Sequence, residues 1–559
     1  MPLTATAIPD TSSGEPYRYE ERSTFTGGLN LRADQFNLEP NESPDLLNVD
    51  VDPRGGVSRR NGIDVINVTA LSGDIQSLLT HHETDGTESV LVTPLNSGGT
   101  ATELWFNGGS GNFTQVTTSG GNVTFDTTQV PVGLTFNDAT YVTNGKPMVS
   151  ESTKSTVKWT GANNATTLTP DTDGSDGHFP AARYVAAWGE YAWAAHLVEG
   201  VTTYANRIRF SKVNDAENWT STDYIDIDIG EDGDVITGLL ADGDRLLVFK
   251  EDSVYAVYGF DRDTFEVQNI TRAAGCMEGS NPVATTVGVF FWYSANGVYL
   301  LQGNQAIWAF DRLKPAVDNG SISTDEAPRL MWFDERLWVS VNYIASNTTA
   351  GANQISRRNV FVWDPTLGDR GAWTRYDINV RDMSVHHIDG EHYGMGVTSE
   401  WSGTAAFTRV AKFNRDVDVD DYNGTTSAEI FSHYQTGWFS GNRPTFPKRW
   451  GKTRTVMLAD NTMTVNMTIY KDYNLGTAVV TRSKTITGQD LTAEWDSAVW
   501  DAATWSTGAE TNIYEFFRWP TAGTAKAISL RFSVTPSSGF RGKWGLTSVV
   551  GMYRTRRIR

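Results

Sequence analysis

The stretch Leu240–Lys250 reads LADGDRLLVFK, an apolar run, a turn at Asp-Gly-Asp and a second apolar run with an aromatic residue near its end. Asp and Gly tolerate the positive φ angles of tight hairpins, so this stretch predicts two antiparallel strands. The pattern recurs at intervals of 46 to 55 residues, with turn centres near Asp85, Asp138, Gly189, Asp242, Gly288, Asp334 and Asp389. A strand-only period of roughly 40 to 55 residues is typical of β-propeller blades.

A second, more polar strand pair follows each of these hairpins. The pairs lie at 104–116, 157–168, 208–221, 254–270, 298–310, 360–378 and 406–414. An apolar inner hairpin and an amphipathic outer one make a four-stranded blade, and blades bury their faces against one another around a channel. We therefore predict an all-β fold with a β-propeller of about seven blades, six and eight being the neighbouring counts. An open array of irregular β-sandwich repeats is the alternative.

The length of 559 residues predicts more than one domain, because single cores rarely grow beyond ~250 to 300 residues. We predict an extended N-terminal arm and attachment segment over 1–70, the propeller over 71–415 and a C-terminal β-sandwich over 416–559. In the arm, Asn41–Asp45 has the pattern of a helix start, but Gly55 and Gly56 end any helix quickly. Alternating strands of the sandwich are expected at 429–439, 464–474, 512–520 and 527–536.

The net charge of −20 argues against a protein that grips nucleic acid through its phosphates. Acidic walls would instead repel a duplex and let it pass, although the same charge also serves solubility. The N-terminus lacks a signal-peptide pattern and no run approaches ~18 apolar residues, so a soluble protein without a membrane-spanning segment is expected. The single Cys276 excludes an intrachain disulfide, favours a reducing compartment and is expected in the core.

Two motifs were considered as metal sites. Asp416, Asp418 and Asp420 have the spacing of a calcium loop, but Asp421 stands where Gly is needed and Ser427 where Glu is needed. The pairs His81–His82 and His386–His387 cannot each chelate one metal, because neighbouring strand residues point to opposite faces. We expect no metal and no cofactor.

Propeller glycosidases work with paired carboxylates at the channel mouth, so catalytic patterns were sought. Asp369–Trp373 and Asn214–Trp219 loosely resemble the aspartate turn of sialidase blades and are interpreted as outer-hairpin turns. No nucleophile elbow, P-loop, zinc-protease helix or dinucleotide-binding turn occurs in the sequence. We predict no catalytic residue and a protein that is not an enzyme, with a propeller glycoside hydrolase as the least favoured alternative.

Three stretches resemble tail proteins of tailed bacteriophages. They are the run from GGLNLRADQF to RRNGI (Gly27–Ile63), the middle stretch Asn206–Gly259 followed by Gly275-Cys276 and ANGVYLLQG (Ala295–Gly303), and SHYQTGWFSGNRPTFPKRWGKTRTVML (Ser432–Leu458). The strongest likeness is to the nozzle, or tail tubular protein B, family of short-tailed phages. Long-tailed phages have minor tail proteins with a similar opening and propeller.

The resemblance implies a structural virion protein, assembled in the host cytoplasm, that forms the nozzle of the tail tube during ejection of the viral genome. It implies a homo-hexameric ring, contacts with the tail adaptor and with tail fibres or spikes, and passage of double-stranded DNA without sequence-specific binding. It carries over no catalytic residue. The alternative from the long-tailed phages is a minor tail or tail-tip protein that binds a host receptor, a surface glycan.

Overall fold

The computed structural model describes residues 17–107, 111–146, 156–168, 179–200, 202–228, 234–343, 357–368, 370–388, 390–399, 406–413, 417, 419–421, 427–459, 463–486, 515–534 and 543–555. In these residues strands are the dominant element, and the helical elements are one short α-helix, α1 (Lys314–Asp318), and one 3-10 turn, η1 (Ser294–Asn296). The all-β prediction is therefore confirmed. No helix among these residues has the length and apolarity to cross a bilayer.

Seven sheets follow one another along the chain, each built mostly from consecutive antiparallel strands. The first three sheets are β8 (Ile75–His82), β9 (Glu88–Pro94), β11 (Trp105–Asn107) and β12 (Thr114–Gln115); β16 (Val132–Phe136), β17 (Ala139–Thr143), β18 (Thr156–Trp159) and β19 (Thr166–Thr167); and β20 (Ala181–Trp188), β21 (Tyr191–Glu199), β22 (Thr202–Lys212) and β23 (Asp215–Asp226). Two small ribbons lie beside the first sheet, β10 (Thr102–Glu103) with β15 (Thr124–Phe125) and β13 (Thr117–Thr118) with β14 (Gly121–Asn122).

The next three sheets repeat this plan. They are β24 (Ile236–Asp242), β25 (Arg245–Lys250), β26 (Val254–Tyr258) and β27 (Glu266–Thr271); β28 (Val283–Thr285), β29 (Gly288–Tyr293), β30 (Gly297–Gln302) and β31 (Gln305–Trp308); and β32 (Ile322–Ser323), β33 (Arg329–Phe333), β34 (Arg336–Tyr343), β35 (Arg357–Asp364) and β36 (Ala372–Tyr376).

The seventh sheet combines strands from two distant parts of the chain. It contains β37 (Val380–Ile388), β38 (Glu391–Thr398), β39 (Arg409–Phe413), β7 (Ile63–Val65), β40 (Asp420–Asp421) and β41 (Ser427–Ala428). Ala411 of β39 lies opposite Val65 of β7 in antiparallel register. The sequence interpretation assigned this region to an N-terminal arm and did not foresee that one of its strands completes a sheet near residue 410.

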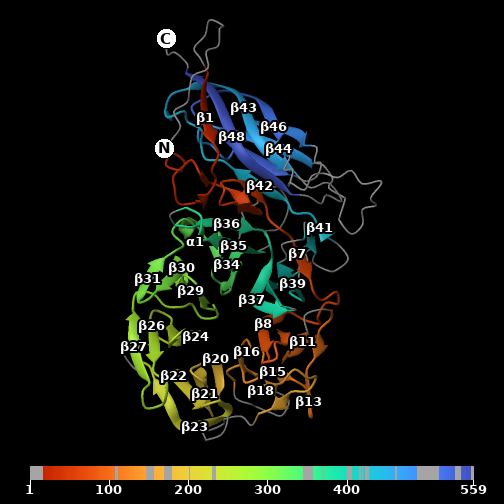
Figure 1. Ribbon diagram of the computed structural model, residues 1–559, viewed down its shortest axis with the longest axis vertical. Helices are drawn as coiled ribbons and strands as arrows, with labels where there is room; N and C mark the ends of the chain where they lie inside the picture. Colours follow the sequence, from red (N-terminus) through yellow and green to blue (C-terminus); the bar gives the residue numbers. More distant parts are fainter. Residues whose placement is uncertain are drawn as a thin grey trace.

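The seven sheets surround a common centre (Figure 1). Their first long strands contact one another in a closed series, in the order β8, β16, β20, β24, β28, β33, β37 and again β8. Each neighbouring pair of sheets shares a cluster of buried apolar side chains. Between the third and fourth sheets, for example, Trp193 is fully buried against Phe210 and Phe265. Burying about 200 Å² of such an aromatic side chain is worth about 5 kcal/mol, so the sheets stabilise one another mainly through these faces.

The predicted inner hairpins are present in the described residues, while the predicted turn centre Asp389 lies outside those residues. The hairpin β33–β34 turns through Asp334 and Glu335, both at φ 55°, and β20–β21 turns through Gly189 at φ 61° and Glu190 at φ 64°. Two successive residues with positive φ match the right-handed twist of the strands that they join. The local turn chemistry that the sequence displays therefore places these hairpins.

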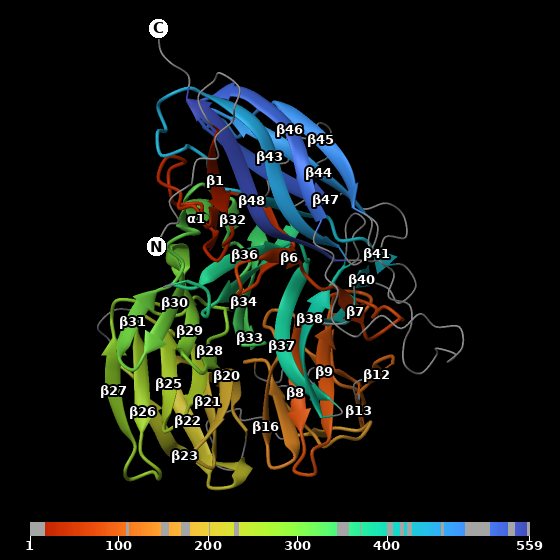
Figure 2. The same ribbon diagram turned by 45° about the horizontal axis from the view of Figure 1, so that its top comes forward.

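A second unit, the two-sheet unit, lies above the ring of sheets (Figure 2). One sheet contains β46 (Glu515–Ala525), β43 (Lys448–Ala459), β48 (Trp544–Thr555), β6 (Val57–Arg59) and β5 (Val49–Val51), with β1 (Arg18–Arg22) on β48. The other contains β4 (Leu46–Leu47), β42 (Ser432–Gln435), β47 (Ile528–Val534), β44 (Met463–Lys471) and β45 (Val480–Ile486). Of the described strands here, the sequence interpretation missed β43, β45 and β48.

The N-terminal segment therefore lies inside the fold. Its strands β1, β4, β5 and β6 belong to the two-sheet unit and β7 to the ring, while β2 (Gly28–Leu29) and β3 (Glu42–Ser43) form a parallel pair of their own. The helix start expected at Asn41–Asp45 is wrong, because Glu42–Ser43 is a strand paired with Gly28–Leu29. A large apolar cluster runs from the two-sheet unit through this segment into the fifth and sixth sheets of the ring.

Candidate functional site

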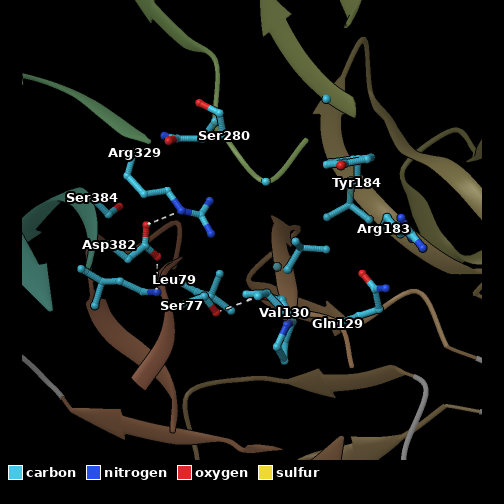
Figure 3. Close-up of a pocket in the computed structure, with 18 of the residues that line it drawn as sticks. Ser77, Leu79, Gln129, Val130, Arg183, Tyr184, Ser280, Arg329, Asp382 and Ser384 are labelled. Carbon is cyan, nitrogen blue, oxygen red and sulfur yellow. Dashed lines mark hydrogen bonds and ion pairs between the residues drawn. The ribbon is translucent and has the colours of Figure 1, made fainter. Parts of the chain in front are cut away.

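A cavity of about 360 Å³ lies at the centre of the ring and is called here the central cavity (Figure 3). Every sheet of the ring contributes to its wall through its first strand or the loop before that strand. The lining residues include Ser77–Leu79, Gln129–Gly133, Arg183–Val185, Gly238–Leu239, Glu278–Pro282, Arg329 and Asp382–Ser384. Residues far apart in the sequence meet here only because the series of sheets is closed.

Two hydrogen bonds from the backbone fix Asp382 in this wall. Its Oδ2 accepts the backbone N–H of Leu78 at 2.9 Å, and its Oδ1 accepts the N–H of Met383 at 3.1 Å. The bond to Leu78 joins the seventh sheet to the first. Asp382 therefore also stabilises the contact between the last and the first sheet of the ring.

Arg329, the first residue of β33, extends into the central cavity (Figure 3). Its Nε lies 3.5 Å from Oδ1 of Asp382, a loose ion pair in which both side chains are largely buried. The other end of the guanidinium points towards the middle of the cavity (Figure 3). Asp382 therefore orients Arg329 mainly from its Nε side.

A second charged pair lies on the far side of the cavity. Nη1 of Arg183 lies 2.7 Å from Oε1 of Glu278, and the Glu278 side chain is 54 % exposed. Tyr184, the residue after Arg183 in β20, also lines the cavity, and its pKa is raised by burial and by the charge of Glu278. The Tyr184 hydroxyl therefore stays protonated at neutral pH and can donate a hydrogen bond.

Two polar residues hold the wall together. Ser77 Oγ contacts Thr93 Oγ1 at 2.7 Å and donates to the carbonyl of Pro131 at 2.9 Å. Asn281 donates to the carbonyl of Leu330 at 2.7 Å and accepts the N–H of Leu330 at 2.8 Å. These bonds join loops to neighbouring sheets and give the cavity a fixed shape.

The histidines singled out in the sequence lie on the first and seventh sheets. His81 is buried, with Nδ1 2.8 Å from Thr140 Oγ1, whereas His82 is exposed and contacts Glu88 at 2.6 Å. His386 is buried, and its Nδ1 lies 3.3 Å from Thr80 Oγ1. Burial lowers the pKa of His386 to about 3. Neighbouring histidines on a strand thus face different surroundings, as alternation requires.

The remaining sequence motifs have structural positions. Asp420 forms a buried two-pronged ion pair with Arg60, at 2.8 and 2.7 Å, while Asp416 and Asp418 lie outside the described residues. The thiol of Cys276 is fully buried, and burial raises its pKa to about 12. The described residues contain no group of three or more His, Cys, Asp or Glu side chains placed to hold a metal ion.

The two stretches that resemble sialidase turns lie at outer hairpins. Trp219, in β23, is buried and donates its ring N–H to the carbonyl of Ala216 at 2.7 Å. Trp373, in β36, is also buried and donates to the carbonyl of Ala309 at 3.2 Å. Both tryptophans pack the sheets of the ring and neither lines the central cavity.

Sequence reasoning predicted no site residue and missed the cavity residues Arg183, Glu278, Arg329 and Asp382. Each stands in the first long strand of its repeat or in the loop before the first strand. That position was the available signal. It has no motif, because the four residues come from four different sheets.

No protein-family model matches the chain, and no curated protein matches it. Among solved structures, the chain is similar to an exo-β-1,3-galactanase from Phanerochaete chrysosporium determined with galactose. That match has a TM-score of 0.23 and 9 % identity, and covers 78 % of this chain and 98 % of the galactanase.

This match corrects one prediction. The sequence interpretation held that the protein is not an enzyme, and the solved structure named above is a glycoside hydrolase. The non-enzymatic prediction is therefore not retained. A likeness with this TM-score and identity assigns neither an activity nor a substrate to the chain.

Proposed function

We propose that the seven sheets are the blades of a β-propeller and that the two-sheet unit is a β-sandwich seated on it. The closed series of contacts between first strands supports a propeller. The pairing of β7 with β39 supports it as well, because a strand from one end of the chain then closes the ring. The shared apolar core of the two upper sheets supports a sandwich.

In this proposal the chain is a structural component of a bacteriophage tail and forms the nozzle through which double-stranded DNA is ejected. The observation that carries it is the path of Gly27–Ile63, the N-terminal stretch with the phage resemblance. This stretch supplies β4, β5 and β6 to the two-sheet unit and reaches β7 in the ring. The stretch thus acts as an internal tie, meaning that it connects the two-sheet unit to the ring. Such a connection is expected in a tail protein that must keep its shape while DNA is ejected.

Buried polar contacts strengthen this tie. Arg60 donates from Nε to Asn48 Oδ1 at 2.9 Å while its other nitrogens bind Asp420. Asp45 lies 3.0 Å from His433 Nε2 and 3.5 Å from both Arg375 and Arg531. Burial opposes ionisation of Asp45, but these three partners together hold its pKa well below the usual range. Such contacts lock the relative position of the ring and the two-sheet unit.

The DNA channel of this proposal lies between subunits. A central cavity of about 360 Å³ has no room for a duplex, so the conduit requires the larger hole of a homo-oligomeric ring, taken here as a hexamer. With a net charge of −20, such a ring would repel DNA phosphates and let the duplex slide without sequence-specific binding.

Electron cryomicroscopy of the phage particle that carries this chain tests the proposal. The expected result is six copies below the adaptor, coaxial with the tail. Density for this chain outside the tail, or a ring without a central passage, would exclude a nozzle. Copies confined to the distal end of a long tail would instead support the tail-tip protein that binds a host glycan.

A further inference from the structure

The Nη atoms at the inner end of Arg329 form no hydrogen bond with the described part of the protein. Both atoms face the open middle of the central cavity (Figure 3). Asp382, which orients the side chain, lies 3.5 Å from Nε. A guanidinium offers two parallel N–H groups in the geometry that a carboxylate accepts.

The neighbouring arginines differ from Arg329 in this respect. Arg358 is bound by Glu326 at 3.0 Å and Arg381 by Asp74 at 3.3 Å. Burial lowers the pKa of Arg358, the charge of Glu326 opposes this effect, and the charges of Arg329 and Arg381 lower the pKa further, so both arginines lie near Arg358. A negative charge bound at the cavity end of Arg329 would therefore also lie near the charge of Arg358.

The rest of the wall limits the kind of anion. The charged lining residues are balanced in sign, since Arg183 and Arg329 face Glu278 and Asp382. A doubly charged phosphate would meet these two carboxylates without enough cations to offset them. A singly charged carboxylate can be bound by the cavity end of Arg329 alone.

Size and the remaining polar groups point to a small polyhydroxylated ligand. A cavity of about 360 Å³ lies at the lower end of the range for small-molecule sites, roughly 300 to 1,000 Å³. The side chains of Gln129 and Tyr184 extend towards the cavity (Figure 3). Leu79, Val130 and Leu239 add apolar surface to its wall. Such a wall can bind hydroxyl groups and one face of a sugar ring.

We infer that the central cavity binds a carboxylate-bearing ligand of about the size of a sugar acid, and that the Nη atoms of Arg329 recognise its carboxylate. Asp382 acts as a positioning residue for Arg329. Tyr184 and Gln129 contact the rest of the ligand. This site is independent of the nozzle proposal, because a tail protein of either kind could contain it.

Isothermal titration of the full-length protein tests the ligand class without any mutation. D-glucuronate is the probe, and D-glucuronamide is its uncharged counterpart. Glucuronate is expected to bind about tenfold or more tighter than the amide, a difference of at least about 1.4 kcal/mol. Equal binding of the two, no glucuronate binding up to about 10 mM, or inorganic phosphate binding as tightly as glucuronate would each overturn the inference.

Two matched variants test the residue. Arg329→Gln is expected to weaken glucuronate binding about tenfold or more while leaving the weak binding of the amide unchanged. Arg245→Gln is the control, because Arg245 pairs with Asp242 at 2.8 Å within the hairpin β24–β25 and is not among the residues that line the cavity. Unchanged glucuronate binding by Arg329→Gln, or an equal loss in both variants, would overturn the assignment.

A third variant covers the case in which Arg329→Gln fails to fold. Tyr184→Phe removes one hydroxyl from the wall and retains the ring. It is expected to weaken glucuronate and glucuronamide binding by the same factor, about three- to tenfold, because the hydroxyl contacts the shared part of the ligand. Full binding of both probes by this variant would contradict the proposed placement of the ligand.

Discussion

The ring and the two-sheet unit are both all-β, but they are assembled in opposite ways. Six sheets of the ring consist of strands that follow one another in the chain. The two-sheet unit instead pairs strands from the N-terminal part of the chain with strands from its C-terminal part. Arg22 of β1 lies opposite Val549 of β48, and Ser548 donates to Glu21 across 527 residues. Closing such a long loop costs conformational entropy before any contact forms, so the ring should form more readily than the two-sheet unit.

The largest expected effect is at the joint between these two regions. Arg60→Ala leaves Asp420 buried without the guanidinium that binds it, and should lower the free energy of unfolding by about 3 to 5 kcal/mol. Denaturant unfolding of the variant measures this loss. Arg32→Ala is the matched control, because Arg32 is 59 % exposed and lies 3.4 Å from Asp311; its loss should stay below about 1 kcal/mol. Similar losses in the two variants would show that the joint does not depend on Arg60.

The closing strand of the ring should be the next most sensitive. Ile63, in β7, is fully buried in the cluster between the sixth and seventh sheets, so Ile63→Ala should cost about 3 kcal/mol. Amide hydrogen exchange should accelerate in β39, its partner strand. Val68→Ala, at a residue that is 52 % exposed, should change stability by less than about 0.5 kcal/mol. Unchanged exchange in β39 would mean that the seventh sheet is stable without β7.

The ring should lose stability as the pH falls below neutral. The pKa of His386 is lowered to about 3 from an ordinary value of 6.5, so between these pH values the unfolded chain binds a proton that the folded protein excludes. This contribution is fully present above about pH 6.5, and the loss should reach about 2 kcal/mol at pH 5.

Unfolding of His386→Asn between pH 7 and pH 4.5 measures that contribution. The variant should show a flatter dependence of stability on pH than the unmodified protein. His392→Asn, at an exposed residue of the adjacent strand, should keep the original slope. An unchanged slope in His386→Asn would show that other groups govern the acid sensitivity.

The smallest expected effect concerns the hairpin turns of the ring. Glu335 is exposed and has φ 55°, a conformation that disfavours side chains, so Glu335→Gly should stabilise the protein by about 0.5 to 1 kcal/mol. Thermal unfolding measures the change. Gly243→Ala, at φ 60° in the equivalent turn and with open space around its Cα, should destabilise by about 1 kcal/mol. A stabilising Gly243→Ala would contradict this account of the turns.

The sequence predicted the ring better than the two-sheet unit for a physical reason. Residues such as Gly189–Glu190 and Asp334–Glu335 favour a turn by their own backbone conformation. The strands on either side of each turn pair with each other, so their paired residues lie within about ten positions in the sequence. Strand β7 has only three residues, Ile63–Val65, and its partner lies about 350 residues away. No local pattern marks such a pairing, and the strand was assigned to an arm.

The candidate site was less predictable for the same reason. Arg329 and Asp382 lie 53 positions apart, and Arg183 and Glu278 come from two other parts of the chain. Linear motifs find residues that a single turn or helix brings together. A cavity built from one strand of each sheet has no such motif, so its residues were found only once the sheets were placed around it.

By itself, the sequence determined the all-β character, the recurring hairpins and their turns, because alternation and positive-φ residues act over a few positions. The tertiary structure alone decided which strands close the ring, how the chain ends are joined and which charges meet in the central cavity. Those outcomes depend on burying the faces of many sheets at once. The free energy of that burial comes from contacts along the whole chain, so no single sequence position indicates it.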